Sequence, residues 1–344
     1  MNRKSILLFG GTSEERMVSV ASAQNLASQW KFDELFFQDN LERVFRVSLQ
    51  ELNAHTNVFK SEFKPPAENQ IGTNLGDILP LLRDAVVFLG YHGSQGENGE
   101  VQTLFEQNKI YFTGSGAKAS HEAFEKDTAK DVMSNTDCLM AEEMRIAVSE
   151  ITEIEDALKL FLKKHKKIVF KPTSSGSSFG LFIVDSEVQL EKAIQEIKKS
   201  PFKQYLAENF IQGRELTVGV VQIKDELISL PASEVILSEG RSFDYDGKYL
   251  GSGTKEVTPA DLTPEQMQQA QKLAIEAHLA FGCYGYSRTD MILSAQGAYF
   301  LETNTLPGLS KPSFVPQQLH AADIAFTKFI EAQLELAEHR YDID

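Results

Sequence analysis

Residues 287–310, SRTDMILSAQGAYFLETNTLPGLS, predict a β-hairpin that carries polar side chains among its strand formers. Two strand-like runs, Thr289–Leu293 and Ala298–Thr303, flank Ser294–Gly297. The glycine and the small polar residues of that connection suit a tight turn. We therefore expect two antiparallel strands joined directly in sequence.

The polar residues of this hairpin are expected on a single face. If the chain turns about Gln296, Asp290 lies across from Glu302, and Arg288 lies across from Asn304. Side chains alternate between the two faces of a strand, so these four share one face. Two carboxylates and an amide gathered there are costly to desolvate without a cation, and hard oxygen ligands of this kind suit magnesium. The alternative is a solvated outer face of an edge hairpin, and the hairpin alone leaves both interpretations open.

The overall composition limits the possible partners. With 344 residues the chain is long enough for two or three domains, and its 42% hydrophobic and 24% charged residues are typical of a soluble globular protein. The formal net charge of −15 argues against a nucleic-acid partner. The two cysteines, Cys138 and Cys283, form no C-x-x-C pair, which excludes a disulfide scaffold and a cysteine-rich zinc site. Because neither a secretory signal nor a membrane span is recognisable, we expect a cytoplasmic protein without a membrane partner.

The first third of the chain predicts an α/β fold. The run SILLFGG is followed by a helical stretch, and Asp84–Gly93 and Lys109–Gly116 repeat the pattern of an apolar strand that ends at glycines. Alternating strands and helices indicate a mostly parallel sheet, whose ligands collect at the carboxyl ends of the strands. The segment Lys60–Gly76 is predicted to be a surface excursion.

From about Lys126 the pattern changes. Helices are predicted in EKDTAKDVM, in EIEDALKLFLKKHKK and over Pro264–Phe281, and strands in KIVFKP, KQYLAENFI and RELTVGVVQI. The polar segment RSFDYDGKYLGSGTKEVTPADL shows no clear period, and an irregular segment of that length in a compact domain is usually functional or disordered.

Two glycine-rich stretches have both a functional and a structural interpretation. In FKPTSSGSSFGL, Lys171 stands at a strand end before a loop whose backbone N–H groups can cradle phosphate, or the loop is a mobile solvated turn. GSGAKA satisfies a relaxed dinucleotide fingerprint, but a plain βα turn explains it better.

Two single residues are equally ambiguous. His92, in the glycine-dense HGSQGENG, either orients a ligand or is a satisfied loop histidine. Glu15 lies near a helix N-terminus, where the helix dipole alone favours a carboxylate, although it could also hold a substrate ammonium.

Nine stretches in a fixed order resemble the D-alanine–D-alanine ligase family of the ATP-grasp enzymes. They are GGTSEERMVSVASA, HGSQGENGEVQ, YFTGSGAKAS, KPTSSGSSFGL, GRELTVGVV, FDYDGKY, PADL, RTDMIL and FLETNTLPGLS. The resemblance implies three domains, at 1–125, 126–214 and 215–344, with a lid at 238–260. It also implies transfer of the ATP γ-phosphate to the carboxylate of one D-alanine and attack by the amine of a second, for peptidoglycan precursor synthesis, in a homodimeric cytoplasmic enzyme.

The resemblance also implies roles for individual residues. The expected ATP contacts are Lys126 and Lys171 at the phosphates, and Lys248 from the lid. Glu208 and Ile211 are expected at adenine, and Glu215 at the ribose. Two magnesium ions, with Mn²⁺ as an alternative, would be bound by Asp290, Glu302 and Asn304. A hydrogen-bonded trio of Glu15, Ser177 and Tyr249 would link phosphate loop and lid. The expected substrate contacts are Glu15 and His92 for the first alanine, Gly308, Ser313 and Phe314 for the second, and Arg288 for the charge that develops during attack.

Departures from the family pattern concern the second substrate. Asn98 stands where an aspartate is usual, and LSKPSF brings Lys311, Pro312 and Phe314 to the acceptor subsite. Another small D-amino acid such as D-serine is therefore an alternative acceptor, whereas Tyr249 disfavours D-lactate. A non-catalytic ligase-like binding protein and a nicotinamide dehydrogenase are the remaining alternatives.

Overall fold

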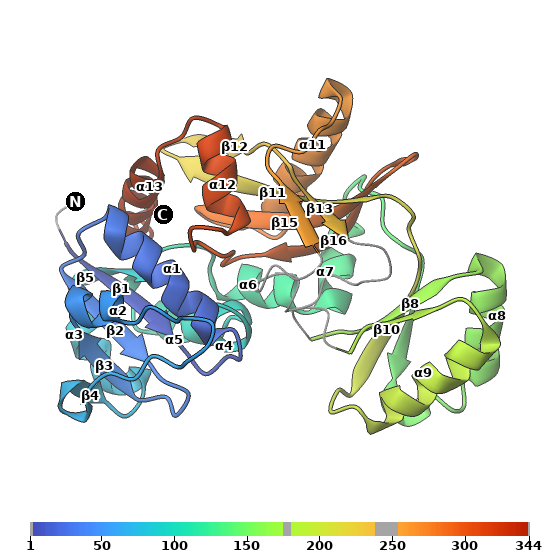
Figure 1. The fold of residues 1–344 in the computed structure, drawn as a ribbon, viewed down its shortest axis with the longest axis horizontal. Coiled ribbons are helices and arrows are strands. Elements are labelled where there is room, and N and C mark those ends of the chain that lie inside the picture. Colours follow the sequence, from blue (N-terminus) through green and yellow to red (C-terminus); the bar gives the residue numbers. More distant parts are fainter. Residues whose placement is uncertain (1–2, 175–179, 238–253, 343–344) are drawn as a thin grey trace.

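The structure is a computed structural model that describes residues 3–174, 180–237 and 254–342. Three β-sheets follow one another along the chain, each flanked by helices (Figure 1). The first sheet lies at the N-terminal end of the molecule, the second lies at the opposite end, and the third lies between and above them in this view.

The N-terminal sheet has the strand order β4-β3-β2-β1-β5-β6. Its strands are β1 (Lys4–Gly10), β2 (Glu34–Gln38), β3 (Val44–Val47), β4 (Gln70–Gly72), β5 (Ala85–Leu89) and β6 (Tyr111–Phe112). Pairing is parallel from β2 through β1 and β5 to β6, as predicted, and antiparallel at β3 and β4. The flanking helices are α1 (Arg16–Gln29), α2 (Leu49–Ala54), α3 (Leu75–Leu82), α4 (Ser94–Glu97), α5 (Glu100–Gln107) and α6 (Ala117–Phe124).

The segment Lys60–Gly76 is more than the surface excursion that its composition predicted. It supplies the edge strand β4 and buries Phe63 against Phe37, with ring centroids 5.0 Å apart. The proline and asparagine residues of this segment have a low propensity for strands, so the sequence did not predict β4. The three-residue strand is stabilised by the neighbouring sheet.

The second sheet is antiparallel throughout, in the order β7-β10-β8-β9. Its strands are β7 (Glu143–Ala147), β8 (Ile168–Pro172), β9 (Phe182–Val184) and β10 (Gln204–Asn209), and its helices are α8 (Glu155–His165) and α9 (Glu187–Lys199). Alternate residues such as Phe170, Tyr205 and Ala207 join the apolar core that α8 and α9 cover. The other face of this sheet is therefore left for charged residues.

The third sheet has the order β14-β13-β11-β15-β16, and β12 also pairs with β11. Its antiparallel strands are β11 (Arg214–Ile223), β12 (Glu226–Ser229), β13 (Ser233–Leu237), β14 (Thr254–Val257), β15 (Tyr286–Ser294) and β16 (Gly297–Asn304). The remaining helices are α7 (Lys126–Met133), α11 (Pro264–Ala280), α12 (Phe314–Ala321) and α13 (Phe326–Glu338).

Helix α7 belongs by packing to the third sheet. Its residues Ala129 and Met133 lie in the core that includes Leu216, Met291 and helix α11. Strand β14 corrects the prediction of an entirely irregular segment there, since Thr254–Val257 pairs with β13. No helix in the described ranges is long and apolar enough to cross a membrane.

A buried histidine in α11 predicts an acid-sensitive fold. His278 is 1% exposed, its Nδ1 lies 2.7 Å from Ser287 Oγ, and burial lowers its pKa to about 4. Because the unfolded chain takes up this proton near pH 6.5 and the folded chain resists it, stability is full above pH 6.5 and falls towards pH 4. We expect a loss of about 2 kcal/mol in the free energy of unfolding between pH 8 and pH 5 from this group.

Denaturant unfolding of the wild type and of His278→Gln at both pH values checks this expectation. The variant should lose about 2 kcal/mol less than the wild type over that interval, whatever its stability at pH 8. Equal losses in the two proteins would contradict the role of His278.

Candidate active site

The hairpin β15–β16 has the cross-strand pairs that its sequence predicted. Arg288 pairs with Asn304, and Asp290 pairs with Glu302. The turn is nevertheless tighter than expected, because Ser294 pairs directly with Gly297. If this register continued along both strands, Asp290 would lie opposite Leu301 and not opposite Glu302.

A register shift restores the predicted pairing. Met291 pairs with Phe300 while Asp290 pairs with Glu302, so Leu301 is the extra residue of a β-bulge. A one-residue shift turns every later side chain to the opposite face, so the bulge decides which side of the sheet Glu302 and Asn304 occupy.

The four polar residues of the hairpin form a connected cluster. Arg288 donates to both carboxylate oxygens of Asp290, with Nε at 2.9 Å and Nη2 at 2.7 Å. Asn304 Nδ2 lies 3.4 Å from Asp290 Oδ2, and the Thr217 hydroxyl of the adjacent strand also donates to Asp290. Lys126, at the start of α7, places its Nζ 3.2 Å from Glu302 Oε2. Each carboxylate therefore has a cationic partner.

This donor set fits a hard divalent cation. Asp290 and Glu302 supply carboxylate oxygens from directly opposed positions, and Asn304 adds an amide on the same face. Their present cationic partners, Arg288 and Lys126, show that the cluster requires positive charge. In the described ranges no group of three or more His, Cys, Asp or Glu residues is arranged as a metal centre. The set consists of two carboxylates and one amide. A small cavity beside it is lined by Glu97, Ala123, Phe124, Lys126, Glu302, Thr303, Asn304 and Thr305.

The second sheet carries a charged cluster of its own. Glu208 is 5% exposed, and its two carboxylate oxygens lie 2.6 Å from Lys171 Nζ and 2.5 Å from Lys130 Nζ. Burial raises the pKa of Glu208, but the charges of Lys171 and Lys130 outweigh that effect and the pKa lies below its ordinary value. Glu208 is therefore an ionised carboxylate between two lysines.

Glu15 and His92 lie close to neighbouring loops. Glu15 is the N-cap of α1 but its side chain caps no N–H group, so the capping interpretation is not supported. A Cβ built on Gly93, whose φ is +66°, would lie 2.7 Å from Glu15 Oε2. His92 is buried with its Nδ1 3.4 Å from Glu97 Oε1, and its Nε2 lies 3.7 Å from a Cβ built on Gly308. His92, in the loop after β5, therefore lies close to Gly308, in the loop after β16.

The residues after β16 form a loop that reaches Arg288 through Phe314. Ser313 Oγ lies 2.7 Å from Ser310 Oγ and equally close to a Cβ built on Gly308. Phe314 begins α12 and is buried, and the guanidinium carbon of Arg288 lies 5.7 Å from the centre of its ring. Lys311 is exposed in this loop. Phe314 thus supports Arg288 through a cation–π contact.

Two family models match the chain. The model for the N-terminus of D-ala D-ala ligases matches residues 4–115, and the model for their C-terminus matches residues 140–335. The chain belongs to the D-alanine–D-alanine ligase family.

Individual relatives agree with this family over nearly their whole length. A D-alanine–D-alanine ligase from Leptospira interrogans is 33% identical, with 98% of this chain and 99% of the relative covered. The crystal structure of the VanG D-Ala:D-Ser ligase from Enterococcus faecalis has a TM-score of 0.81 at 26% identity, covering 98% of this chain and 100% of its own. D-alanyl-alanine synthetase A from Vibrio cholerae has a TM-score of 0.77 at 25% identity, with the same coverage. The three-sheet fold is accordingly the ATP-grasp architecture of this ligase family.

The remaining residues expected from the ligase family are only partly described. Ile211 lies between β10 and β11, where the second and third sheets are joined, and Glu215 lies on β11 opposite Ile292, on the face that carries Asp290. Three residues, Ser177, Lys248 and Tyr249, lie outside the described residues, as does the expected lid 238–260 up to residue 253. The described end of that lid contains β14, where burial raises the pKa of Glu256.

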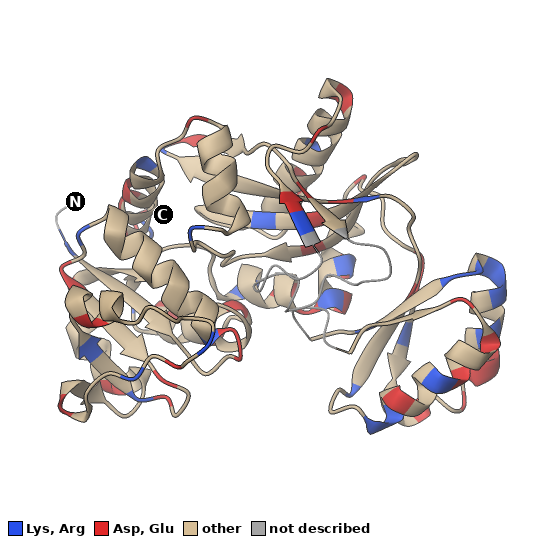
Figure 2. Ribbon diagram, viewed as in Figure 1, with Lys and Arg blue, Asp and Glu red and all other residues tan. Residues whose placement is uncertain are grey.

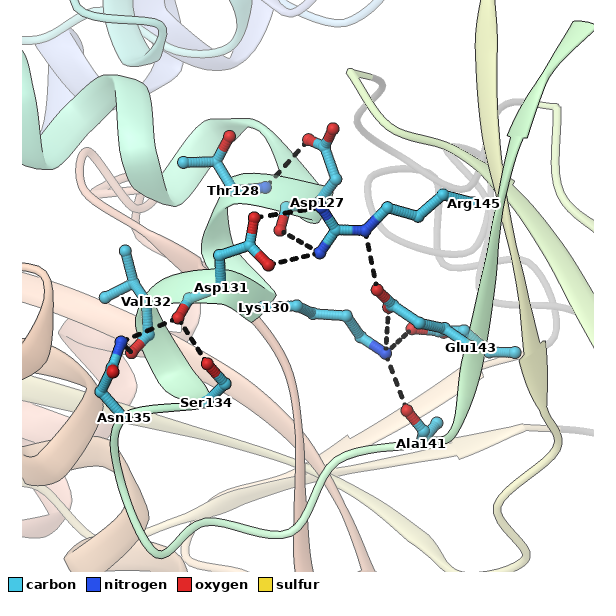
Figure 3. A network of polar contacts seen from close by, with 11 residues as sticks. Asp127, Thr128, Lys130, Asp131, Val132, Ser134, Asn135, Ala141, Glu143 and Arg145 are labelled. Atoms are coloured by element: carbon cyan, nitrogen blue, oxygen red, sulfur yellow. Dashed lines mark hydrogen bonds and ion pairs between the residues drawn. The ribbon is translucent and has the colours of Figure 1, made fainter.

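Sequence reasoning identified Lys171, but it missed the other charged residues near Glu208, which are Lys130, Glu143 and Arg145. Lys130 Nζ lies 2.8 Å from Glu143 Oε2 and donates a hydrogen bond to the carbonyl oxygen of Ala141 at 3.0 Å (Figure 3). Arg145 donates to Glu143 and to Asp131 of α7. Two signals were available, the lysines four residues apart in KDTAK and the alternation of charged and apolar residues in EMRIA.

Proposed function

We propose that this chain is an ATP-dependent ligase that joins two D-alanines through an acyl phosphate. The observation that carries this proposal is the pairing of Asp290 with Glu302 beside Arg288 and Asn304, with Lys126 reaching Glu302 from α7. A face with these carboxylates and cations suits a polyphosphate that carries a metal ion. We infer the reaction from the ligase family to which the chain belongs.

We assign the first step to the residues that face this hairpin. The lysines Lys126 and Lys171 bind the ATP phosphates, and Glu208, Ile211 and Glu215 lie along the nucleotide. Asp290, Glu302 and Asn304 would hold a magnesium pair, which would neutralise charge at the transferring phosphoryl group. A carboxylate oxygen of the first D-alanine attacks the γ-phosphorus, the bond to the β-phosphate oxygen breaks, and ADP leaves.

We assign the second step to the loops around Arg288. Glu15 holds the ammonium of the first alanine with His92 beside it, while the Gly308 N–H and Ser313 bind the carboxylate of the second. The amine of the second alanine attacks the acyl carbon, an N–C bond forms, the amine loses a proton, and phosphate departs. Arg288, held by two hydrogen bonds to the carboxylate of Asp290, stabilises the developing oxyanion.

A different acceptor is the second candidate. Phe314 contacts Arg288, and Lys311 adds a positive charge in the same loop. Because these residues depart from the family pattern, the acceptor subsite of this chain differs from that pattern. D-serine, a substrate of the VanG ligase named above, is a specific alternative.

The wider setting follows from the family resemblance. We propose that the product enters peptidoglycan precursor synthesis, that the enzyme works in the cytoplasm where ATP is available, and that it is a homodimer. Mn²⁺ is an alternative to Mg²⁺ for the same oxygen ligands.

The test is phosphate release from Mg-ATP with D-alanine alone and then with D-alanine plus a panel of second amino acids, with products identified by mass. Release with D-alanine alone and a D-alanyl-D-alanine mass is the expected result. Release only with another acceptor would transfer the proposal to that acceptor. The absence of release under every condition would favour a binding protein.

A further inference from the structure

The two sheets that flank α7 share one arrangement of charge. In the third sheet Asp290 and Glu302 are directly opposed across β15 and β16. In the second sheet Glu143 and Glu208 are directly opposed across β7 and β10. Like charges in directly opposed positions repel one another unless a cation joins them.

Helix α7 supplies a cation in both places. Lys126 reaches Glu302, and Lys130, one turn later, reaches Glu143 and Glu208. Residues four apart lie on the same side of a helix, so one side of α7 serves both sheets. Figure 2 shows acidic and basic residues next to each other on α7.

Lys130 is shielded from direct contact with a ligand. Its side chain is 6% exposed, and its Nζ is surrounded by Glu143, Glu208 and the carbonyl oxygen of Ala141. Lys171 holds the other oxygen of Glu208 and is more accessible, at 12% exposure. Of these two lysines, Lys171 is therefore the one placed to exchange Glu208 for a phosphate.

We propose that Lys130 is a positioning residue that keeps Glu208 ionised and in place, so that Lys171 can leave Glu208 for the phosphates of ATP. When Lys171 turns to a phosphate, Glu208 retains Lys130 at 2.5 Å and stays compensated. Without Lys130, Glu208 and Glu143 face each other in a buried setting and Lys171 is the cation that Glu208 retains. Phosphate must then compete with a buried carboxylate for this lysine. This inference rests on the proposed function, because it takes ATP as the ligand.

The test is calorimetric titration of the full chain with Mg-ATP in the absence of D-alanine. We expect Lys130→Met to weaken the Kd for Mg-ATP by about tenfold, the effect of a close ionic coupling. Lys159→Met, which breaks an ion pair with Glu155 on the surface of α8, is the matched control and should leave the Kd unchanged. In the assay for dipeptide, Lys130→Met should raise KM for ATP more than it lowers kcat.

A second substitution separates positioning from direct contact. Glu208→Gln removes the charge that holds Lys171, so the double variant K130M/E208Q should bind Mg-ATP as tightly as E208Q alone. This comparison remains decisive if K130M does not fold, because the double variant loses one cation and one anion together. A double variant that binds about tenfold more weakly than E208Q would mean that Lys130 acts independently of Glu208 and would overturn the proposal. A wild-type protein that does not bind Mg-ATP would refute the proposed function instead.

Discussion

Asp290→Asn is expected to reduce Mg-dependent dipeptide formation by about a thousandfold, equivalent to about 4 kcal/mol of transition-state stabilisation. The carboxylate of Asp290 is in contact with Arg288, Thr217 and Asn304, and it lies opposite Glu302. Asparagine keeps the shape and one oxygen acceptor but removes the negative charge that a divalent cation needs. Initial rates over a range of Mg²⁺ concentrations measure the loss.

The control for Asp290→Asn is Glu234→Gln. Glu234 makes the same two-pronged contact with an arginine, Arg214, with both distances 2.6 Å. Glu234 lies on β13 of the same sheet, which pairs with β11 and not with the hairpin. The control should keep its rate, and the thermal midpoints of the two variants should be similar. Wild-type turnover in Asp290→Asn would contradict the assignment of this residue as a metal ligand.

Arg288→Met is expected to reduce dipeptide formation by about a hundredfold to a thousandfold, the loss typical of a donor to a developing oxyanion. Arg288 is held by its hydrogen bonds to Asp290 and by its contact with the ring of Phe314, so little rearrangement is needed when charge develops. The Kd for Mg-ATP should change much less than the rate, because the proposed contact exists only during the second step.

Single-turnover measurement of ADP and dipeptide resolves the two steps of Arg288→Met. ADP formation with D-alanine should continue while dipeptide lags behind. Arg214→Met, the partner of the earlier control, should behave as the wild type. Equal losses of ADP and dipeptide would place Arg288 in the phosphoryl-transfer step and would refute its assignment to the second.

The sequence predicted the pairing of the hairpin because polar residues at two-residue spacing limit the possible registers. It did not predict how the pairing arises, since the two-residue turn and the bulge at Leu301 compensate for each other. A bulge depends on the packing of the strands, and no residue type in FLETN predicts its position. The correct residues were therefore brought together by a different local geometry.

The charged cluster around Glu208 escaped prediction for a related reason. Glu208 was assigned to an adenine contact from the family resemblance, and its side chain lies between Lys130 and Lys171. An ion pair between a helix and a sheet forms only when segments distant in sequence pack together. The alternation of charged and apolar residues within one strand does not identify which residue of another segment will be the ion-pair partner. The adenine contact of Glu208 stays a prediction.

Weak strands were also difficult to predict. Strand β14 follows a polar segment and β4 has three residues, so neither shows the apolar alternation that identifies β1, β5 or β11. Both are edge strands whose stability comes from a neighbouring strand. Sequence patterns recover the buried strands of this fold more readily than its edges.

The bulge at Leu301 divides the hairpin into two independent parts. Between the turn and the bulge, the pairs from Ser294–Gly297 to Met291–Phe300 keep the register that the tight turn sets. Beyond the bulge, the pairs that begin with Asp290–Glu302 have a register shifted by one residue. Length variation near the turn can therefore be absorbed by gaining or losing a bulge before it reaches the charged pair. The tip of this hairpin is a place where related chains can differ in length while Asp290 and Glu302 stay directly opposed.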